Sequence, residues 1–263
     1  MTAHATQTRI PTGIAGLDEM LRGGFLPRSA NLVEGAPGTG KSTLGMQFIQ
    51  HNITANDAPG IILTFEEFPE HYYRDAASFG WDFQAHEAAG KLRVIMTSPE
   101  VTRADVKAIN GRLEMMVKNM DARCILVDSL SHFEYLTSDP VELRRMVYEL
   151  INGLKRLGLT AVLTRENAAL LGETPESEED LAFVVDSYTM LRYVEFQSAV
   201  HRALLVLKQR GSAHARDIRQ YAITNSGVEV RSRFKNTQGI MSGSPTLSNV
   251  EAFAAAFLPQ GKK

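Results

Sequence analysis

A glycine-rich segment near the N-terminus constrains this chain more than any other feature. Residues 35–42 read GAPGTGKS, which fits the pattern G-x-x-x-x-G-K-[ST], and a threonine follows. An apolar run at residues 30–33 precedes the segment, and residues 43–49 are typical of a helix. Between a strand and a helix, the N–H groups of such a loop point together at an anion. The pattern therefore predicts a phosphate loop that binds a nucleoside triphosphate.

The residue types of this loop assign a role to most of its positions. Glycine lets the backbone fold tightly around a phosphate group. The ammonium group of Lys41 is expected at the β- and γ-phosphates, and the hydroxyl of Ser42 can ligate Mg²⁺. We expect the following residues to bind ATP: Gly35, Ala36, Pro37, Gly38, Thr39, Gly40, Lys41, Ser42 and Thr43.

The composition is typical of a globular chain with a sizeable core, since apolar residues make up 44% and charged residues 22% of 263 positions. A net charge of −2 gives no general attraction to nucleic acid or anionic membranes. No apolar run approaches the roughly 20 residues of a membrane span. The single cysteine, Cys124, excludes an intrachain disulfide and lies in an apolar run, so we expect a buried, inert thiol and a cytoplasmic protein.

Strand-like and helix-like segments alternate along the chain, which predicts an α/β fold with a mostly parallel sheet flanked by helices. The predicted strands are residues 30–33, 60–65, 92–96, 124–127, 160–164, 184–191 and 203–207, and helical spacing predicts a helix at 141–157. The sequence NSG at 225–227 joins 221–224 to 228–230 in a small antiparallel edge hairpin. We expect one ATPase domain over residues 1–247 and a tail, 248–263, that could form a short helix.

Acidic residues follow two of the predicted strands. Ligands of open α/β sheets bind beyond the carboxyl ends of the strands. Asp128 follows the apolar run 124–127, an arrangement that holds Mg²⁺, usually through water, in phosphate-loop enzymes. Glu66 and Glu67 end another strand, where a carboxylate can activate the water that attacks the γ-phosphate. Because neighbouring residues of a strand face opposite ways, we expect at most one of the two glutamates to point at that water.

Several short motifs extend along nearly the whole chain in a fixed order. They are TGIxGLD at residues 12–18, FEE at 65–67, SFGWD at 78–82, VDSL at 127–130, LKQRGSxH at 207–214 and SGSP at 242–245. Together with the phosphate loop, this series resembles the KaiC family of RecA-like P-loop ATPases over about residues 9–247. The clock protein of that family looks like two such domains in tandem. This chain holds one, and its SGSP motif makes it more similar to the second.

The resemblance implies a six-membered ring with ATP and Mg²⁺ bound between subunits and a signalling or timing role. It further implies that Lys208, Arg210 and His214 reach the phosphates of the neighbouring subunit. Lys208 and Arg210 are two residues apart at the end of a strand, so both side chains leave the same face. A guanidinium group at the γ-phosphate neutralises charge in the transition state. The expected catalytic set is therefore Lys41, Glu66 or Glu67, and the incoming Lys208 and Arg210.

Three alternatives to a simple ATPase accompany this resemblance. The clock protein of the family resembles an autokinase, but alignment places its Ser-Thr acceptor pair at Ala182 and Phe183, which have no hydroxyl group. A slow nucleotide-dependent switch that binds a signalling partner stays open. A DNA-binding ATPase is disfavoured, because the expected channel loop 172–180 has five acidic residues and no basic one. The second expected channel segment, residues 135–140, also lacks a basic residue.

Overall fold

The computed structural model describes residues 8–167, 181–196, 198–234, 237–238 and 246–247. Its centre is a nine-stranded sheet in the order β3-β2-β4-β5-β1-β6-β7-β8-β9. The parallel strands are β1 (Ala30–Gly35), β2 (Gly60–Thr64), β3 (Leu92–Met96), β4 (Cys124–Asp128), β5 (Thr160–Glu166) and β6 (Ser187–Phe196). The antiparallel strands are β7 (Ala199–Gln209), β8 (Arg219–Thr224) and β9 (Gly227–Arg233). A separate ladder pairs β10 (Thr237–Gln238) with β11 (Thr246–Leu247).

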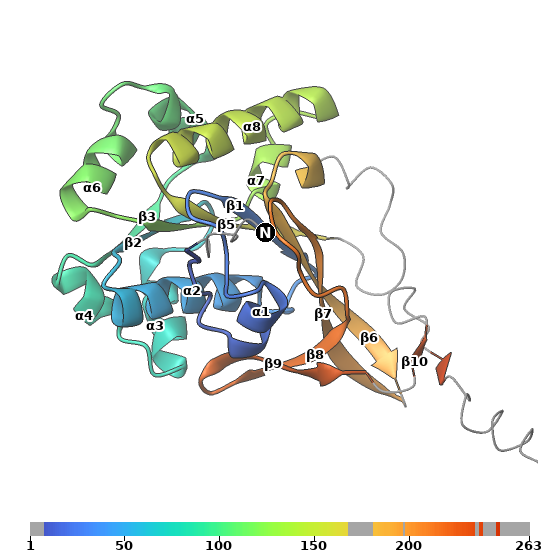
Figure 1. Ribbon diagram of the computed structural model, residues 1–263. Helices are drawn as coiled ribbons and strands as arrows, with labels where there is room; N and C mark the ends of the chain where they lie inside the picture. The colour runs from blue at the N-terminus through green and yellow to red at the C-terminus, as the bar shows by residue number, and fades with distance from the viewer. Residues whose placement is uncertain (1–7, 168–180, 197, 235–236, 239–245, 248–263) are drawn as a thin grey trace, which may run out of the picture.

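Helices cover both faces of the sheet (Figure 1). One layer contains α1 (Ala15–Met20), α2 (Lys41–Asn56), α3 (Pro69–Ser78) and α4 (Phe83–Ala88). The other contains α5 (Pro99–Lys107), α6 (Arg112–Met120), α7 (Ser131–Glu134) and α8 (Pro140–Arg156). Because each layer packs on its own face of the sheet, the buried side chains form two large clusters. Phe48 of α2 belongs to the first cluster and Leu150 of α8 to the second.

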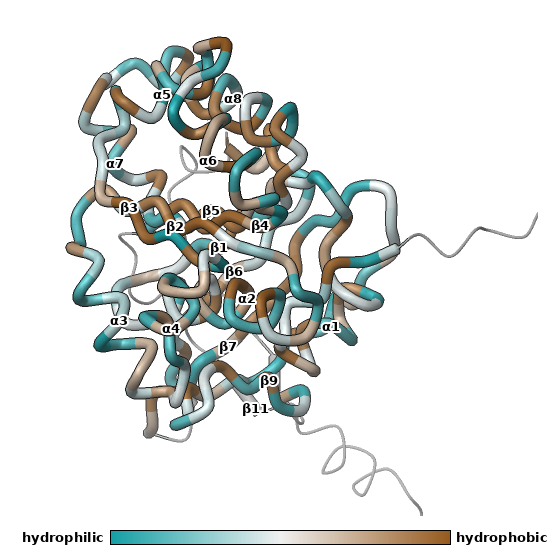
Figure 2. Tube along the Cα trace, turned by 90° about the vertical axis from the view of Figure 1, so that its left-hand side faces the viewer, coloured by the Kyte–Doolittle hydropathy of each residue, from teal (hydrophilic) through white to brown (hydrophobic). Residues whose placement is uncertain are grey.

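The central strands β2 and β4 are buried on both faces and are therefore mostly apolar. Neighbouring residues alternate between the two cores, as Ile61 and Ile62 of β2 show. Figure 2 shows these hydrophobic segments running through the middle of the molecule. Capping residues begin several helices: Asp139 accepts a hydrogen bond from Val141 N (2.9 Å) at the start of α8, with Pro140 as the first helical residue.

The predicted α/β class, the parallel core and the helix at 141–157 are confirmed. The five strands predicted first are also confirmed, with small differences at their ends, and so is the hairpin at 221–230, where Thr224 pairs with Gly227. The glycine of this turn has a φ of 109°, a conformation that other residues rarely adopt. The phosphate loop is followed by a longer helix than the predicted 43–49, since α2 begins at Lys41 and ends at Asn56.

The next two predicted strands are also present, but their bounds differ from the prediction. The strand expected at 184–191 begins only at Ser187 and extends to Phe196, and the one expected at 203–207 covers Ala199–Gln209. These two strands pair with each other as a long antiparallel hairpin, so the antiparallel part of the sheet is larger than a small edge hairpin. Polar residues such as Arg192 and Arg202 interrupt the apolar runs, which is why the pattern underestimated both strands.

Two other predictions concern the whole chain. Cys124 is buried, as expected, and burial raises the pKa of its thiol to about 12, which supports the prediction of an inert thiol. Within the described ranges, no helix combines the length and the hydropathy needed to cross a membrane. The acidic segment 172–180 and the tail at 248–263 lie outside the described residues.

Candidate nucleotide site

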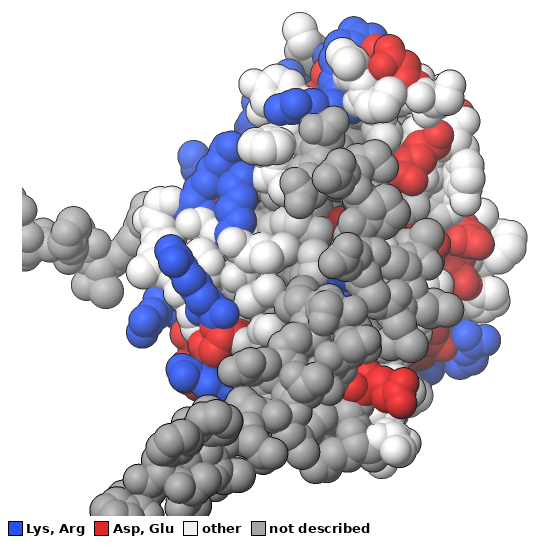
Figure 3. Space-filling model, turned by 90° about the vertical axis from the view of Figure 1, so that its right-hand side faces the viewer, with Lys and Arg blue, Asp and Glu red and all other residues white. Residues whose placement is uncertain are grey.

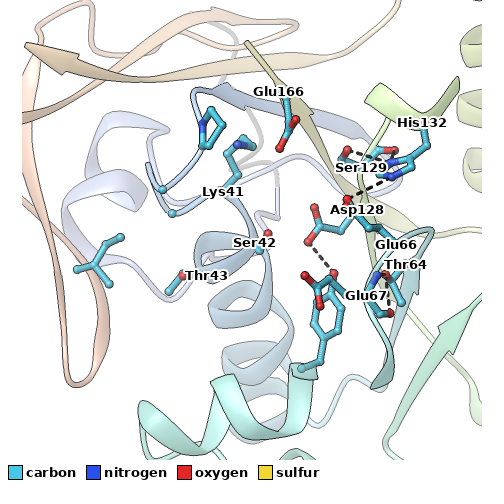
Figure 4. Close-up of a pocket in the computed structure, with 15 residues that line it drawn as sticks. Lys41, Ser42, Thr43, Thr64, Glu66, Glu67, Asp128, Ser129, His132 and Glu166 are labelled. Atoms are coloured by element: carbon cyan, nitrogen blue, oxygen red, sulfur yellow. Dashed lines mark hydrogen bonds and ion pairs between the residues drawn. The ribbon is translucent and has the colours of Figure 1, made fainter. Parts of the chain in front are cut away.

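A pocket of about 340 Å³ lies at the carboxyl ends of β1, β2, β4 and β5 (Figure 4). The phosphate loop forms one wall, residues after β2 and β4 form the opposite wall, and Glu166 at the end of β5 lies beside Lys41. Loops that follow neighbouring parallel strands meet at this edge of the sheet, which explains why distant sequence segments converge here.

The phosphate loop is folded back on itself behind this pocket. Gly38 and Gly40 have φ values of 76° and 93°, which turn the chain before α2 begins. The Thr39 hydroxyl and the Lys41 ammonium group both donate to the carbonyl oxygen of Ala36, at 2.7 and 3.1 Å. These hydrogen bonds fix the turned shape of the loop, whose residues line the pocket.

The predicted phosphate-loop residues divide into two groups. Those that line the pocket are Pro37, Gly38, Gly40, Lys41, Ser42 and Thr43. Gly35, Ala36 and Thr39 lie behind them and shape the loop. A Cβ atom on Gly35 would lie 2.6 Å from the carbonyl oxygen of Leu191, so only glycine allows β1 and β6 to pair this closely.

Lys41 carries the positive charge of the loop. Its side chain is buried, and burial lowers the pKa of its ammonium group, an effect that the carboxylates of Glu166, Asp128 and Glu34 partly offset. A buried ammonium group with few hydrogen-bonding partners is ready to bind an anion, because a phosphate replaces the lost water.

Asp128 is held in one orientation by two hydroxyl groups. Tyr72 Oη donates to Asp128 Oδ2 at 2.7 Å, and the Thr164 hydroxyl donates to Oδ1. Burial and the neighbouring Asp128 charge raise the pKa of Tyr72, so its phenol stays a donor. Ser42 faces the same pocket.

This donor set fits Mg²⁺, which prefers oxygen ligands and keeps several water molecules. Among the described residues, no three His, Cys, Asp or Glu side chains converge as a metal site formed by protein alone. Ser42 and Asp128 would therefore hold Mg²⁺ together with phosphate oxygens and water.

Glu66 and Glu67 both line the pocket, and that at most one of them points at the attacking water stays a prediction. The strand argument behind it does not apply, because β2 ends at Thr64 and the two glutamates lie in a bend. The Thr64 hydroxyl donates to the carbonyl oxygen of Glu67 and accepts from its N–H, both at 3.0 Å, which closes the bend. Both carboxylates are thus available near the place where a γ-phosphate would lie.

The sequence analysis missed several residues that line this pocket: Thr64, Tyr72, Ser129, His132, Glu166 and Ile223. Glu166 ends a predicted strand, so the rule that located Asp128 could have found it. Ser129 follows Asp128 directly. Tyr72 and His132 come from helices α3 and α7, and no local pattern in the sequence indicates that these helices reach the pocket.

Lys208 and Arg210 lie away from this pocket. Lys208 pairs with Tyr188 near the start of β6, whereas the phosphate loop follows the far end of the neighbouring β1. A six-residue strand such as β1 separates its two ends by about 17 Å. Neither side chain lines the pocket of its own chain, and neither does His214, which is half-buried in the segment after β7.

The two cations share one side of the molecule, as their spacing predicts. Lys208 Nζ donates to the carbonyl oxygens of Ala182 and Val185 at 2.5 and 2.8 Å, and Arg210 donates to that of Phe183 at 2.6 Å. Partial burial and then the neighbouring Arg210 charge lower the pKa of Lys208. The protein thus holds two positive charges side by side on the segment that precedes β6.

A family model described as "ATPase: KaiC" matches residues 10–235. The chain is 32% identical over 256 residues to the circadian clock protein KaiC3 of Synechocystis sp., which covers 96% of this chain and 50% of that protein. It is 31% identical to the circadian clock oscillator protein KaiC of Thermostichus vulcanus, over 95% of this chain and 48% of that protein. For the KaiC of Picosynechococcus sp. the identity is 34%, over 84% of this chain and 44% of that protein. The chain therefore spans about half the length of the curated relatives it matches.

Proposed function

This chain belongs to the KaiC family of ATPases, and on that premise we propose that it binds ATP with Mg²⁺ and hydrolyses it at sites completed by a neighbouring copy. The observation that carries the hydrolytic part is the arrangement of one pocket. A phosphate loop with Lys41 and Ser42 faces Asp128 and two glutamates across a space of about 340 Å³. This combination supplies a phosphate site, metal ligands and a base at once.

In the proposed reaction, the backbone N–H groups of the phosphate loop and Lys41 hold the β- and γ-phosphates. Ser42 and Asp128 would hold Mg²⁺, which would neutralise charge on the phosphate oxygens. Glu66 or Glu67 accepts a proton from the water that attacks the γ-phosphorus, the bond from this phosphorus to the β–γ bridging oxygen breaks on the opposite side, and ADP and inorganic phosphate leave. Tyr72 and Thr164 keep Asp128 directed at the metal position through the hydroxyl groups that bind it.

The charge of the pocket supports the contribution of a second copy. Of the described residues that line it, only Lys41 is a lysine or arginine, whereas four are carboxylates: Glu66, Glu67, Asp128 and Glu166. A site with this excess of negative charge is unfavourable for a tetra-anionic nucleotide, even with Mg²⁺. We infer that Lys208 and Arg210 of a neighbouring copy supply the missing cations, with His214 beside them.

Other charged side chains lie near Lys208. Lys155 forms an ion pair with Asp186 at 2.5 Å, and both lie close enough to Lys208 to affect its pKa. Figure 3 shows Lys and Arg side chains along one margin of the face toward the viewer and Asp and Glu mainly along the opposite margin. Contacts between unlike surfaces of successive copies produce a closed ring when the rotation between them closes. We propose a homo-oligomeric ring, with six copies as the stoichiometry that the family resemblance implies.

The autokinase alternative is weaker. Lys208 and Arg210 hold the segment at Ala182 and Phe183, so this segment would approach the neighbour's nucleotide together with them. Neither residue has a hydroxyl group that could accept a phosphoryl group. A slow switch that binds a partner in one nucleotide state remains the second candidate, and its signature would be slow turnover with nucleotide-dependent capture of that partner. DNA binding stays disfavoured, because residues 135–140 carry no positive charge.

Phosphate release from the purified chain tests the proposed function. We expect release that requires both ATP and Mg²⁺, and a decrease of about 100-fold or more when Glu66 and Glu67 are both changed to Gln. The double variant should still bind ATP, because neither carboxylate holds the phosphates. A control with Glu70→Gln, on the outer side of α3, should keep the wild-type rate. Binding of ATP by the wild type without phosphate release would contradict the proposed hydrolysis.

A further inference from the structure

We propose that His132 is a positioning residue that holds Glu66 over the pocket, so that Glu66 and not Glu67 activates the attacking water. This inference rests on the proposed ATPase function and deepens it. Each of the two adjacent glutamates has its own histidine, Glu66 with His132 and Glu67 with His71. The two pairs differ in how firmly the histidine is held and in the helix that carries it, which is α7 for His132 and α3 for His71.

The imidazole ring of His132 is fixed from several sides. It packs against the rings of Phe65 and Tyr135, with centroid distances of 5.9 and 5.8 Å. Its Nδ1 lies 3.4 Å from the hydroxyl oxygen and 3.3 Å from the carbonyl oxygen of Ser129, directly after Asp128. The side chain is only 20% exposed. The other ring nitrogen, Nε2, is therefore held in a constant direction.

That direction is toward Glu66. His132 Nε2 lies 3.4 Å from Glu66 Oε2, and Figure 4 shows the carboxylate and the ring facing each other at the rim of the pocket. The Glu66 side chain is 76% exposed, so without this contact it would rotate freely in solvent. An exposed ion pair contributes little to stability. Its effect is instead to reduce the orientations that the base can adopt, which is what catalysis by a positioned group requires.

Glu67 contacts a histidine that is less firmly held. Its carboxylate contacts His71 in the first turn of α3, and the two side chains are 54% and 45% exposed. The Glu67 backbone is fixed by Thr64, but its carboxylate depends on a histidine that is itself half exposed. Glu67 is therefore engaged by α3, whereas Glu66 is engaged by the segment that carries Asp128.

The charges around His132 are consistent with one main partner. The charged side chains that line the pocket beside it are Lys41, Glu66, Glu67, Asp128 and Glu166. On its own helix, Glu134 binds Arg165 at 3.0 Å. Among the described residues, Glu66 is the carboxylate within ion-pair distance of the His132 ring.

A double-mutant cycle on steady-state phosphate release tests the inference. His132→Phe keeps the aromatic packing but removes the contact with Glu66, so kcat should fall about 10-fold while the KM for ATP stays within about twofold. His132→Gln places an amide donor near the position of Nε2 and should recover most of this loss. Glu66→Gln should lower kcat by about 100-fold or more, and more than Glu67→Gln does. Adding His132→Phe to Glu66→Gln should cause no further decrease, because a positioning residue has no effect once its target is lost.

His71→Ala is the matched control, since it removes the histidine of the other glutamate, and it should leave kcat within about twofold. Thermal unfolding of each variant separates lost activity from lost structure, and His132→Ala replaces His132→Phe if the latter does not fold. Additive losses from His132→Phe and Glu66→Gln, or a larger effect of Glu67→Gln than of Glu66→Gln, would overturn the inference while the ATPase function stands. A wild-type chain that binds ATP but releases no phosphate would instead contradict the proposed function itself.

Discussion

Single residues define the chemistry of the pocket, and Lys41 does so most clearly. Its ammonium group is buried at the base of the phosphate loop, among carboxylates that favour its charged form. Its hydrogen bond to Ala36 satisfies part of its donor capacity, and the remaining donors face the space where phosphate oxygens would lie.

Lys41→Ala should abolish ATP binding. A hydrogen bond to a charged group is worth about 1.5–3 kcal/mol, so each bond from Lys41 to a phosphate contributes about 10- to 150-fold in affinity. Lys41 is the only lysine or arginine among the described residues that line the pocket. Calorimetric titration with ATP and Mg²⁺ measures this. Lys118→Ala, an exposed lysine on α6 that pairs with Glu114, should bind ATP normally. Wild-type affinity in Lys41→Ala would remove the basis for the nucleotide site.

The thiol of Cys124 should resist modification in the folded protein. Its folded pKa of about 12 lies above the ordinary value of 9.0, so the thiol stays protonated at pH 8 and lacks the reactive thiolate. The sign of the shift means that this group stabilises the fold below about pH 9 and loses that effect as the pH rises toward 12. Labelling by a thiol reagent at pH 8 should be about 100-fold slower than in denaturant. Equal rates in the two conditions would show that the side chain is accessible.

Among single residues, the sequence predicted those that belong to a recognisable local pattern. The phosphate loop, Asp128 and the glutamate pair all lie at one pocket, because each follows a strand whose apolar run is legible. The same reasoning did not reveal Tyr72 or His132. Their contribution depends on how α3 and α7 lie against the sheet, and this is decided by tertiary packing and not by neighbouring residues.

The elements show why the antiparallel part of the sheet matters for the site. Tyr221 of β8 donates a hydrogen bond to the carbonyl oxygen of Thr39 at 2.6 Å, within the phosphate loop. Arg202 of β7 approaches the carbonyl oxygen of Gly38 at 3.5 Å and lies over the ring of Tyr193, at 5.6 Å from its centroid. Strands β6 to β8 therefore support the phosphate loop, and Ile223 of β8 also lines the pocket.

Tyr221→Phe should weaken this support. Tyr221 is buried, and its removal leaves the Thr39 carbonyl without a donor, at a cost of about 1–3 kcal/mol in the free energy of unfolding. ATP affinity should fall as well, because the loop loses one of the contacts that define its shape. Urea unfolding and ATP titration measure the two effects. Tyr135→Phe, at a side chain that is 83% exposed, should change neither quantity. Identical behaviour of the two variants would contradict the role given to β8.

The sequence predicted the bounds of β1 to β5 better than those of β6 and β7 for a physical reason. Strands in the middle of the sheet, such as β2 and β4, are buried on both faces and mostly apolar, whereas polar residues such as Arg192 and Arg202 interrupt the apolar runs of β6 and β7. The start of β6 was misplaced because residues 181–184 are apolar but belong to a short turn that packs on the α8 layer. Only the pairing of β6 with β1 and β7 shows where the strand begins.

At the scale of the whole molecule, the two halves of the proposed catalytic site do not meet within one copy of the chain. The phosphate loop and the glutamates lie at the carboxyl ends of the parallel strands. Lys208, near the last residue of β7, pairs with Tyr188 at the start of β6, and Arg210 directly follows β7. Because the first half carries excess negative charge and the second positive charge, each is complementary to the other half on a second copy. We therefore expect turnover to depend on assembly, so that dilution below the dissociation constant of the assembly abolishes it.

Complementation between two inactive variants tests this account most directly. Arg210→Ala lacks the incoming cation but keeps its glutamates, and a chain with both Glu66→Gln and Glu67→Gln lacks the base but keeps Arg210. Each alone should bind ATP and release almost no phosphate. When the two are mixed and allowed to exchange subunits, the account predicts recovery of a substantial part of the wild-type rate, because interfaces with an intact pocket and an intact Arg210 form. A mixture that assembles, as light scattering would show, yet remains as inactive as its components would contradict catalysis between neighbouring copies.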